Sequence, residues 1–501
     1  MPGNVVRVYP ASGAVAMLPL TPANNYLPTM LLCGGSDMPD YSWGNYSFPF
    51  IDTWNYPASK DCQRITPEPT DGSTPQYVQD DDMLEGRTMG QFIILPDGKL
   101  LVVNGGLNGT AGYSQATLTT PTFAQMPFGE SLASGPVLTP AIYDPNAAPG
   151  SRWSNAGLSA STIPRLYHSS AMLLPDASVM IAGSNPNIDV NLTTIFPTTY
   201  KIEIFYPPYF SASTRPVPTG IPKNISYGGN SFDITVPASS YSGSANDAAD
   251  ATTVVLHRGG FTTHAMNMGQ RYLQLNNTYT VNKDGSLTLH VAQAPPNPNL
   301  FQPGPAFLFV TIHGIPSNGT YVIVGNGQIG TQPTAAASVL PANVRLASAS
   351  GSASPSSTTG GADTAKTQSH TAIIAAVVGG IAAIAVLGAI IGIYLARRRR
   401  AGGRGAPGTS YPMKGGGGGM DIGAPTPMGS RAMRSSDSSA FIPLQQDNYS
   451  HAWNASNASL VAPYRDDGIP SGRASGTGMS MDYDPYASSP MPSHGTPQQR
   501  F

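Results

Sequence analysis

A pattern that occurs twice in the first part of the chain constrains its fold most strongly. Residues 86–106 read GRTMGQFIILPDGKLLVVNGG: an arginine, a short polar stretch, an apolar run, Pro-Asp, a second apolar run and small residues. Residues 163–184, IPRLYHSSAMLLPDASVMIAGS, repeat this order with Ala177 in place of the turn glycine. Two short apolar runs separated by turn residues predict two antiparallel strands joined as a hairpin. We therefore expect this part of the chain to be built from repeated hairpins.

Repeated hairpins that end in glycine or another small residue are typical of the blades of a kelch-type β-propeller. A third run, YLPTMLLCGG at residues 26–35, has a similar length and the same ending. At about 50 residues per blade, residues 1–205 supply about four blades, and a closed ring typically has four to eight. An incomplete ring would leave unpaired strand edges. We therefore expect residues 1–205 to form a partial propeller whose first blades lie upstream of Met1.

The pattern changes after residue 205. Residues 206–341 contain short segments that alternate apolar and polar residues, among them SFDITVP, ATTVVLHRGG, SLTLHVA and AFLFVTIHG. Such segments, with turns between them, predict a β-sandwich of the immunoglobulin-like kind. The composition agrees, because 55 glycines, 48 prolines and only 11% charged residues suit short strands and turns better than long surface helices. The expected fold class is all-β.

One segment predicts a membrane anchor. Residues 371–396, TAIIAAVVGGIAAIAVLGAIIGIYLA, carry no charge and are long enough to form a transmembrane helix. Four arginines follow at residues 397–400, and arginines beside a span stay on the cytoplasmic side. We therefore expect a single-pass plasma-membrane protein with residues 1–370 outside the cell. Residues 342–370 would be a Ser/Thr-rich stalk, and residues 397–501 a disordered cytoplasmic tail.

Candidate glycosylation sites agree with an exported amino-terminal part. Six Asn-x-Ser/Thr sites precede the predicted span, and such sites mark surface loops of exported chains. They are Asn45, Asn108, Asn191, Asn224, Asn276 and Asn318. The first residues of the chain nevertheless lack the basic start and continuous apolar core of a signal peptide, which is a second reason to expect upstream sequence. The net charge of −2 gives no reason to expect nucleic acid as a partner.

The two repeats differ at one chemically important place. Aligned on Pro96 and Pro175, they place Thr88-Met89 opposite Tyr167-His168. A further histidine, His264, lies in the loop-like segment HRGGFTTHAMNMGQR of the second domain. Two imidazoles and a phenol would suit copper, zinc, iron or nickel. Two simpler interpretations stay open: the repeat has drifted, or the adjacent tyrosine and histidine point to opposite faces of a strand.

An acidic run is a weaker candidate for a metal site. Residues 79–86 read QDDDMLEG, and calcium prefers several oxygen ligands. The alternative is a solvated loop, because charge runs in a surface segment need no ligand.

Three segments together carry a resemblance to a known family. NVVRVYPASGAVAMLPLTPANNYLPTMLLCGGSD, RLYHSSAMLLPD and GGFTTHAMNMGQRYLQL resemble glyoxal oxidase, of the copper radical oxidase family that includes galactose oxidase. The resemblance runs from about residue 4 to residue 324. It implies a seven-bladed kelch propeller followed by an immunoglobulin-like domain, with one copper ion near the propeller axis. Tyr167 would be the axial ligand and proton acceptor, and His168 and His264 would be the histidine ligands.

The implied activity is the oxidation of small aldehydes, such as glyoxal, to carboxylic acids with reduction of dioxygen to hydrogen peroxide. The resemblance also implies a radical-storing tyrosine, cross-linked to a cysteine and placed upstream of the YPASG segment. That pair is absent here. Cys33 and Cys62 resemble positions downstream of it, and we expect them to form a disulfide, although two separate buried thiols are an alternative.

Without the radical pair, the chain would bind copper but lack a second one-electron carrier. The alternative function is therefore a non-catalytic, membrane-anchored propeller used in adhesion or cell-wall binding.

Overall fold

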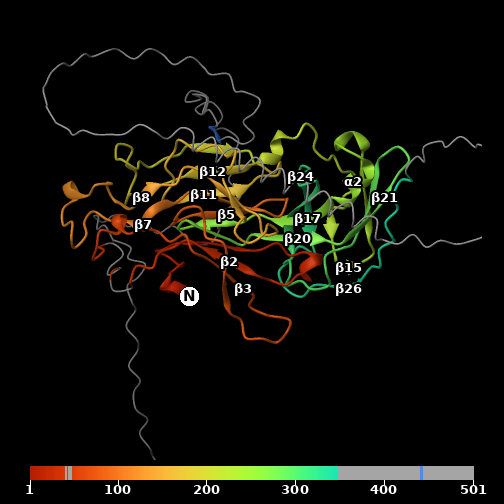
Figure 1. Ribbon diagram of the computed structural model, residues 1–501, viewed down its shortest axis with the longest axis horizontal. Coiled ribbons are helices and arrows are strands. Elements are labelled where there is room, and N and C mark those ends of the chain that lie inside the picture. Colours follow the sequence, from red (N-terminus) through yellow and green to blue (C-terminus); the bar gives the residue numbers. More distant parts are fainter. Residues whose placement is uncertain (40–41, 43–47, 348–440, 444–501) are drawn as a thin grey trace, which may run out of the picture. The chain divides into compact units, whose positions relative to one another are not determined.

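The computed structural model describes residues 1–39, 42, 48–347 and 441–443 (Figure 1). Strands dominate this part of the chain, as expected for an all-β fold. The α-helix with described bounds is α2 (Ala245–Asp250), which begins with a Ser244 cap. The described 3-10 turns are Pro2–Asn4, Pro22–Asn24, Thr53–Asn55, Phe123–Gln125, Pro208–Ser211 and Ala238–Ser240.

Residues before 206 supply all but one strand of three four-stranded antiparallel sheets. The second and third sheets contain the two predicted hairpins, whereas the run at residues 26–35 contains a single strand, Met30–Cys33. The first sheet consists of β1 (Ala14–Met17), β2 (Met30–Cys33), β3 (Cys62–Ile65) and β4 (Tyr77–Gln79). The second consists of β5 (Gln91–Ile94), β6 (Leu100–Val103), β9 (Ala141–Tyr143) and β10 (Trp153–Ser154). The third consists of β11 (Ser169–Leu173), β12 (Val179–Gly183), β13 (Ile202–Phe205) and β27 (Phe441–Pro443).

Three such sheets are one fewer than the length of this region predicts. The reason is a separate hairpin, β7 (Gly106–Tyr113) and β8 (Ser131–Pro136), which uses the chain between β6 and β9 without joining a four-stranded sheet. The predicted boundary at residue 205 coincides with the end of β13. The described strands are therefore consistent with propeller blades, and the closed ring of the resemblance remains an expectation.

The first strands of the three sheets pack in a row, because β5 contacts both β1 and β11. Figure 1 labels β5 beside β11. The chain reaches each of these strands through a residue in the left-handed region: Ser12 (φ 49°), Met89 (φ 57°) and His168 (φ 61°). Non-glycine residues adopt this conformation infrequently. Met89 and His168, which are aligned in the sequence, therefore also have the same backbone conformation. Only their side chains differ.

The second domain is a β-sandwich. Its larger sheet contains β14 (Asn224–Ile225), β25 (Thr320–Val324), β23 (Gly304–Ile312), β17 (Thr252–Arg258) and β20 (Arg271–Leu275), with β24 (Ile315–Pro316) beside β23. The smaller sheet contains β16 (Phe232–Val236), β22 (Leu287–Val291) and β21 (Asn277–Val281). β15 (Tyr227–Gly229) pairs with β26 (Thr334–Ala337). Alternate residues of both sheets, such as Leu256 and Leu289, form one buried core.

The outer face of the larger sheet packs directly on the blades. Val255 and Tyr272 are buried with Phe92 and Ile94, and Phe309 joins a second cluster formed mainly by blade residues. β5 is the last strand of its sheet, so one of its edges is open to the sandwich. Side chains of the sandwich form hydrogen bonds with backbone groups along that edge. The two domains are therefore joined by a buried seam.

The predicted anchor and most of the stalk and tail lie outside the described residues. Within the described residues, no helix combines the length and the hydropathy needed to cross a bilayer. Within the predicted tail, Phe441–Pro443 forms β27 and pairs antiparallel with β13. The pairing satisfies backbone groups at an open strand edge.

Candidate metal centre

Tyr167 and His168 lie immediately before β11, where the backbone is firmly held. The buried side chains of Arg165 and Glu203 form an ion pair at 2.7 Å just before the pair. The backbone N–H of Asn185 donates to the carbonyl oxygen of Tyr167 at 2.7 Å. Tyr167 is buried, and the ring of His168 stacks on it with a centroid separation of 3.8 Å. The left-handed conformation of His168 explains why these adjacent rings lie together and do not alternate as in an extended strand.

His264 reaches the same place from the second domain. It occupies the turn of a hairpin formed by β18 (Phe261–Thr263) and β19 (Met266–Met268). The two turn residues, His264 (φ 52°) and Ala265 (φ 62°), are both left-handed, which is the requirement of a tight type I′ turn. β18 contacts β11, and β19 contacts both β1 and β5, so the hairpin lies among the first strands of all three sheets.

The base of this hairpin is held by hydrogen bonds to the open edge of β5. Gln270 accepts from the backbone N–H of Ile94 at 3.0 Å and donates to the carbonyl oxygen of Phe92 at 2.6 Å. Asn267 donates to the same carbonyl at 2.8 Å. Gln270 thus makes the two hydrogen bonds that a neighbouring strand would make to β5, which is a structural role. The consequence is that the position of His264 is fixed relative to the blades.

The three predicted residues therefore converge. The ring centroids of His168 and His264 are 5.9 Å apart, and those of Tyr167 and His264 are 6.3 Å apart. Two imidazoles bound to one ion at about 2 Å can have ring centres up to about 6 Å apart. Both histidine side chains are exposed, so an ion could reach them. The donor set fits copper, because two imidazoles and a phenolate suit a transition metal.

The protonation of His168 and the hydrogen bond of His264 also favour metal binding. Although part of its surface is exposed, the partial burial of His168 lowers its pKa; the nearby His264 lowers it further, and a backbone hydrogen bond with Asn185 opposes this effect. A lowered pKa keeps the imidazole neutral, which is the form that binds metal. Nδ1 of His264 lies 2.8 Å from the hydroxyl of Thr263. When Nδ1–H donates to that hydroxyl, the lone pair of Nε2 is available to an ion.

Two further tyrosines border the centre and were not predicted from the sequence. The ring of Tyr9 lies 5.7 Å from that of His264, edge to face, and its hydroxyl lies 3.5 Å from the hydroxyl of Tyr167. The ring of Tyr113 lies 6.2 Å from that of Tyr167. No local signal in the sequence marks Tyr9, because the alignment of Ser12 with Met89 and His168 places Tyr9 opposite Gly86 and Arg165. Among the described residues, no group of three or more His, Cys, Asp or Glu side chains is placed to hold a metal.

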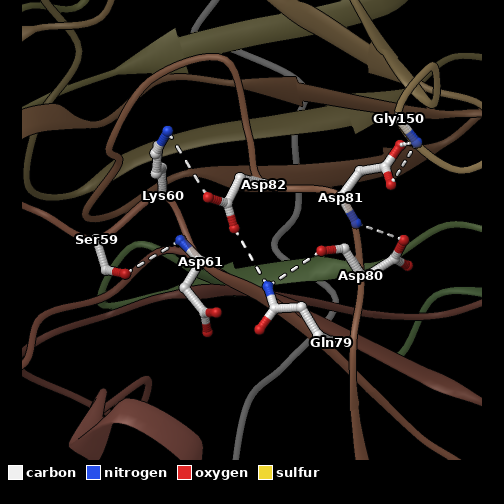
Figure 2. Close-up of a pocket in the computed structure, with 8 residues that line it drawn as sticks. All are labelled: Ser59, Lys60, Asp61, Gln79, Asp80, Asp81, Asp82 and Gly150. Atoms are coloured by element: carbon white, nitrogen blue, oxygen red, sulfur yellow. Dashed lines mark hydrogen bonds and ion pairs between the residues drawn. The ribbon is translucent and has the colours of Figure 1, made fainter.

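The acidic run at residues 79–86 has a structural role (Figure 2). Asp80 pairs with Arg64 and Arg152 and accepts from the Tyr143 hydroxyl at 2.6 Å. Burial raises the pKa of the Asp80 carboxyl, but the Tyr143 hydrogen bond, a backbone hydrogen bond from Asp81 and the Arg64 charge lower it overall.

Its neighbours are also engaged. Asp81 accepts from the backbone N–H of Gly150 at 2.7 Å and of Arg152 at 3.0 Å. Asp82 lies 3.7 Å from the Lys60 ammonium. These contacts give each of the three aspartates a partner within the protein, so the calcium interpretation has no support.

Cys33 and Cys62 form the expected disulfide and join neighbouring positions of β2 and β3. They are the only cysteines of the chain, so neither is available for a thioether to a tyrosine.

The candidate glycosylation sites differ in accessibility. Asn224, Asn276 and Asn318 are exposed, and Asn191 is half-buried. Asn108 is half-buried within β7 and donates to the Ser134 hydroxyl at 3.2 Å. Asn45 lies outside the described residues.

Two family models match the chain in succession. Residues 1–209 match the glyoxal oxidase N-terminus, and residues 215–324 match the galactose oxidase-like early set domain. The chain is 32% identical to aldehyde oxidase GLOX1 of Arabidopsis thaliana over 333 residues, which are 64% of this chain and 48% of that protein. It is 32% identical to aldehyde oxidase GLOX of Vitis pseudoreticulata over 320 residues, 63% of this chain and 54% of that protein.

More distant matches include galactose oxidase of Gibberella zeae, which is 28% identical over 254 residues, 49% of this chain and 31% of that protein. A solved structure described as a novel fungal alcohol oxidase of the AA5 family, in complex with copper, has 20% identity and a TM-score of 0.43, covering 62% of this chain and 53% of that one. The chain spans about half the length of the two aldehyde oxidases it matches. The chain therefore carries a glyoxal oxidase N-terminal segment followed by a galactose oxidase-like early set domain, and Tyr167, His168 and His264 lie within these two matched segments.

Proposed function

We propose that this protein is a copper-dependent oxidase of small aldehydes such as glyoxal. The reaction would combine an aldehyde, water and dioxygen to give a carboxylic acid and hydrogen peroxide. The observation that supports it is the convergence of one phenol and two imidazoles from two domains that match glyoxal oxidase and galactose oxidase-like family models. The names of the two plant relatives, both aldehyde oxidases, support the substrate class.

Each residue has a distinct part in this proposal. His168 and His264 would hold the ion, each with one ring nitrogen oriented by a neighbouring hydrogen bond. Copper would supply exchange of one electron at a time. Tyr167 would be a third ligand and would accept the proton of the hydrated aldehyde. Its buried position keeps the phenol oxygen at a fixed point beside the histidine rings.

Oxidation of a hydrated aldehyde removes two electrons, so a second one-electron carrier must act with copper. Cys33 and Cys62 cannot supply the thioether of the family's radical tyrosine, because they are bonded to each other. The alternative function, a non-catalytic propeller used in adhesion or cell-wall binding, would need no such carrier. That alternative has no need of tight copper binding, whereas the oxidase does.

The test of the oxidase is peroxide production from glyoxal by the full-length protein and two variants. His264→Ala should abolish production, because the ion loses the ligand from the second domain. His313→Ala is the matched control, since His313 is also an exposed histidine of the sandwich with a left-handed backbone (φ 52°). It should retain production. Retained activity in His264→Ala would refute the assignment.

We also propose that residues 371–396 anchor the protein in the plasma membrane, with residues 1–370 outside. The uncharged segment and the four arginines after it support this topology.

A further inference from the structure

We infer that Tyr9 is a positioning residue of the metal centre, which orients the Tyr167 oxygen and the His264 ring toward the same ion. The inference rests on the proposed copper site and adds a residue to it. Tyr9 contacts one residue from each side of the domain seam, since Tyr167 precedes β11 and His264 belongs to the sandwich hairpin. No other side chain among the described residues has ring contacts with both Tyr167 and His264 apart from His168.

The backbone around Tyr9 is fixed by the neighbouring blade. The three residues that follow Tyr9 each have a carbonyl oxygen that accepts a hydrogen bond. Pro10 accepts from the N–H of Ala111 at 2.8 Å, and Ala11 accepts from the Thr88 hydroxyl at 2.7 Å. Ser12 accepts from the N–H of Met89 at 2.6 Å. Because these bonds involve protein groups alone, the position of Tyr9 is set independently of any ion.

Two contacts carry the positioning. The Tyr9 ring meets His264 edge to face at 5.7 Å with an interplanar angle of 79°, an arrangement that aromatic pairs prefer. The Tyr9 hydroxyl lies 3.5 Å from that of Tyr167, the long end of hydrogen-bond range. Hydrogen bonds at such centres often shorten when the site is assembled. In the structure the Tyr167 hydroxyl donates to that of Tyr9. A phenolate oxygen bound to copper has no proton to donate but still accepts hydrogen bonds, so the Tyr9 hydroxyl would then be the donor.

Tyr113 provides a matched comparison. Its ring lies 6.2 Å from that of Tyr167, almost the same as the 6.3 Å of Tyr9. Both tyrosines are half-buried and belong to the same apolar cluster. The hydroxyl contact with Tyr167 and the ring contact with His264 belong to Tyr9. Comparing Tyr9→Phe with Tyr113→Phe therefore separates the effect of the Tyr9 contacts from the effect of removing any hydroxyl near Tyr167.

The experiment is a copper(II) titration of the full-length protein and of Tyr9→Phe, Tyr113→Phe and Tyr167→Phe, followed by the phenolate-to-copper absorption band. Tyr167→Phe should lose the band. Tyr9→Phe should keep the copper stoichiometry but bind about tenfold more weakly, as is typical when a group that orients a ligand is removed. Its band should move to longer wavelength, because the phenolate loses a hydrogen-bond donor. Tyr113→Phe should match the parent protein in both respects.

The outcomes distinguish this inference from the proposed function. A parent protein that binds no copper, or a band that survives Tyr167→Phe, overturns the copper site and the role of Tyr9 with it. A normal parent together with an unchanged Tyr9→Phe overturns the role of Tyr9 alone. The copper-free thermal midpoint of Tyr9→Phe should equal that of the parent, since the ring against His264 is kept. A lower midpoint with an unmoved band would indicate a merely structural residue and overturn the inference.

Discussion

His257 makes the seam between the two domains sensitive to acid. It lies on β17 with 1% of its surface exposed, and its Nε2 lies 2.7 Å from the carbonyl oxygen of Ile94 on β5. Nε2 therefore carries the proton, and Nδ1 is buried without a hydrogen-bond partner. Burial lowers the pKa of His257 to about 4, against an ordinary value of 6.5. Protonation would place a charge and an unpaired N–H inside the seam.

The sign and size of the effect follow from this difference in pKa. The unfolded chain takes up the proton near pH 6.5, whereas the folded protein takes it up only near pH 4. The free energy of unfolding therefore falls as the pH drops through this window. The loss is about 3 kcal/mol once the pH is below 4, and about 2 kcal/mol by pH 5. Such a loss is a large part of the 5–15 kcal/mol that is typical of a folded protein.

The assay compares urea unfolding of the parent protein with that of His257→Gln from pH 7.5 to pH 4.5. The glutamine amide can donate to the Ile94 carbonyl and does not titrate, so every other titrating group cancels in the difference. We expect the parent to lose about 2 kcal/mol relative to the variant between pH 7.5 and pH 5. Parallel pH profiles would show that the seam accepts a charged His257 and would refute the reasoning.

Two other predictions concern the hairpin and the membrane. Gln270→Ala should lower the free energy of unfolding by about 1–3 kcal/mol, because it leaves the buried N–H of Ile94 unpaired. It should also weaken copper binding through His264, while Gln274→Ala on β20 serves as control; unchanged binding would contradict the hairpin's role. Protease added to intact cells should cut residues 1–370 and spare residues 397–501 if the predicted topology holds. Cleavage of the tail would contradict the topology.

The sequence was most informative where one local pattern repeats. The alternation of apolar runs and turns predicted the β5–β6 and β11–β12 hairpins, because strand pairing within a hairpin depends on neighbouring residues. The alignment of Met89 with His168 proved structural, since both have the same left-handed backbone. The all-β fold class followed from the same patterns.

The features missed by the sequence analysis depend on contacts between distant residues. Tyr9 and Tyr167 are 158 positions apart, and nothing local to either residue reveals that their hydroxyls meet. The sequence gives Gln270 no special role, because its role depends on the open edge of β5, whose backbone groups it pairs with. The β7–β8 hairpin contains residues that the estimate from chain length placed in a fourth blade. The strand at Phe441–Pro443 depends on the open edge of β13 and not on its own sequence alone.

The most direct test of the central claim is the copper content of the full-length protein after equilibration with trace copper and removal of free metal. A centre built from Tyr167, His168 and His264 predicts one ion per chain, none in the double variant His168→Ala/His264→Ala, and one again in His313→Ala. A parent protein without copper, or a double variant that binds as much as the parent, would contradict it.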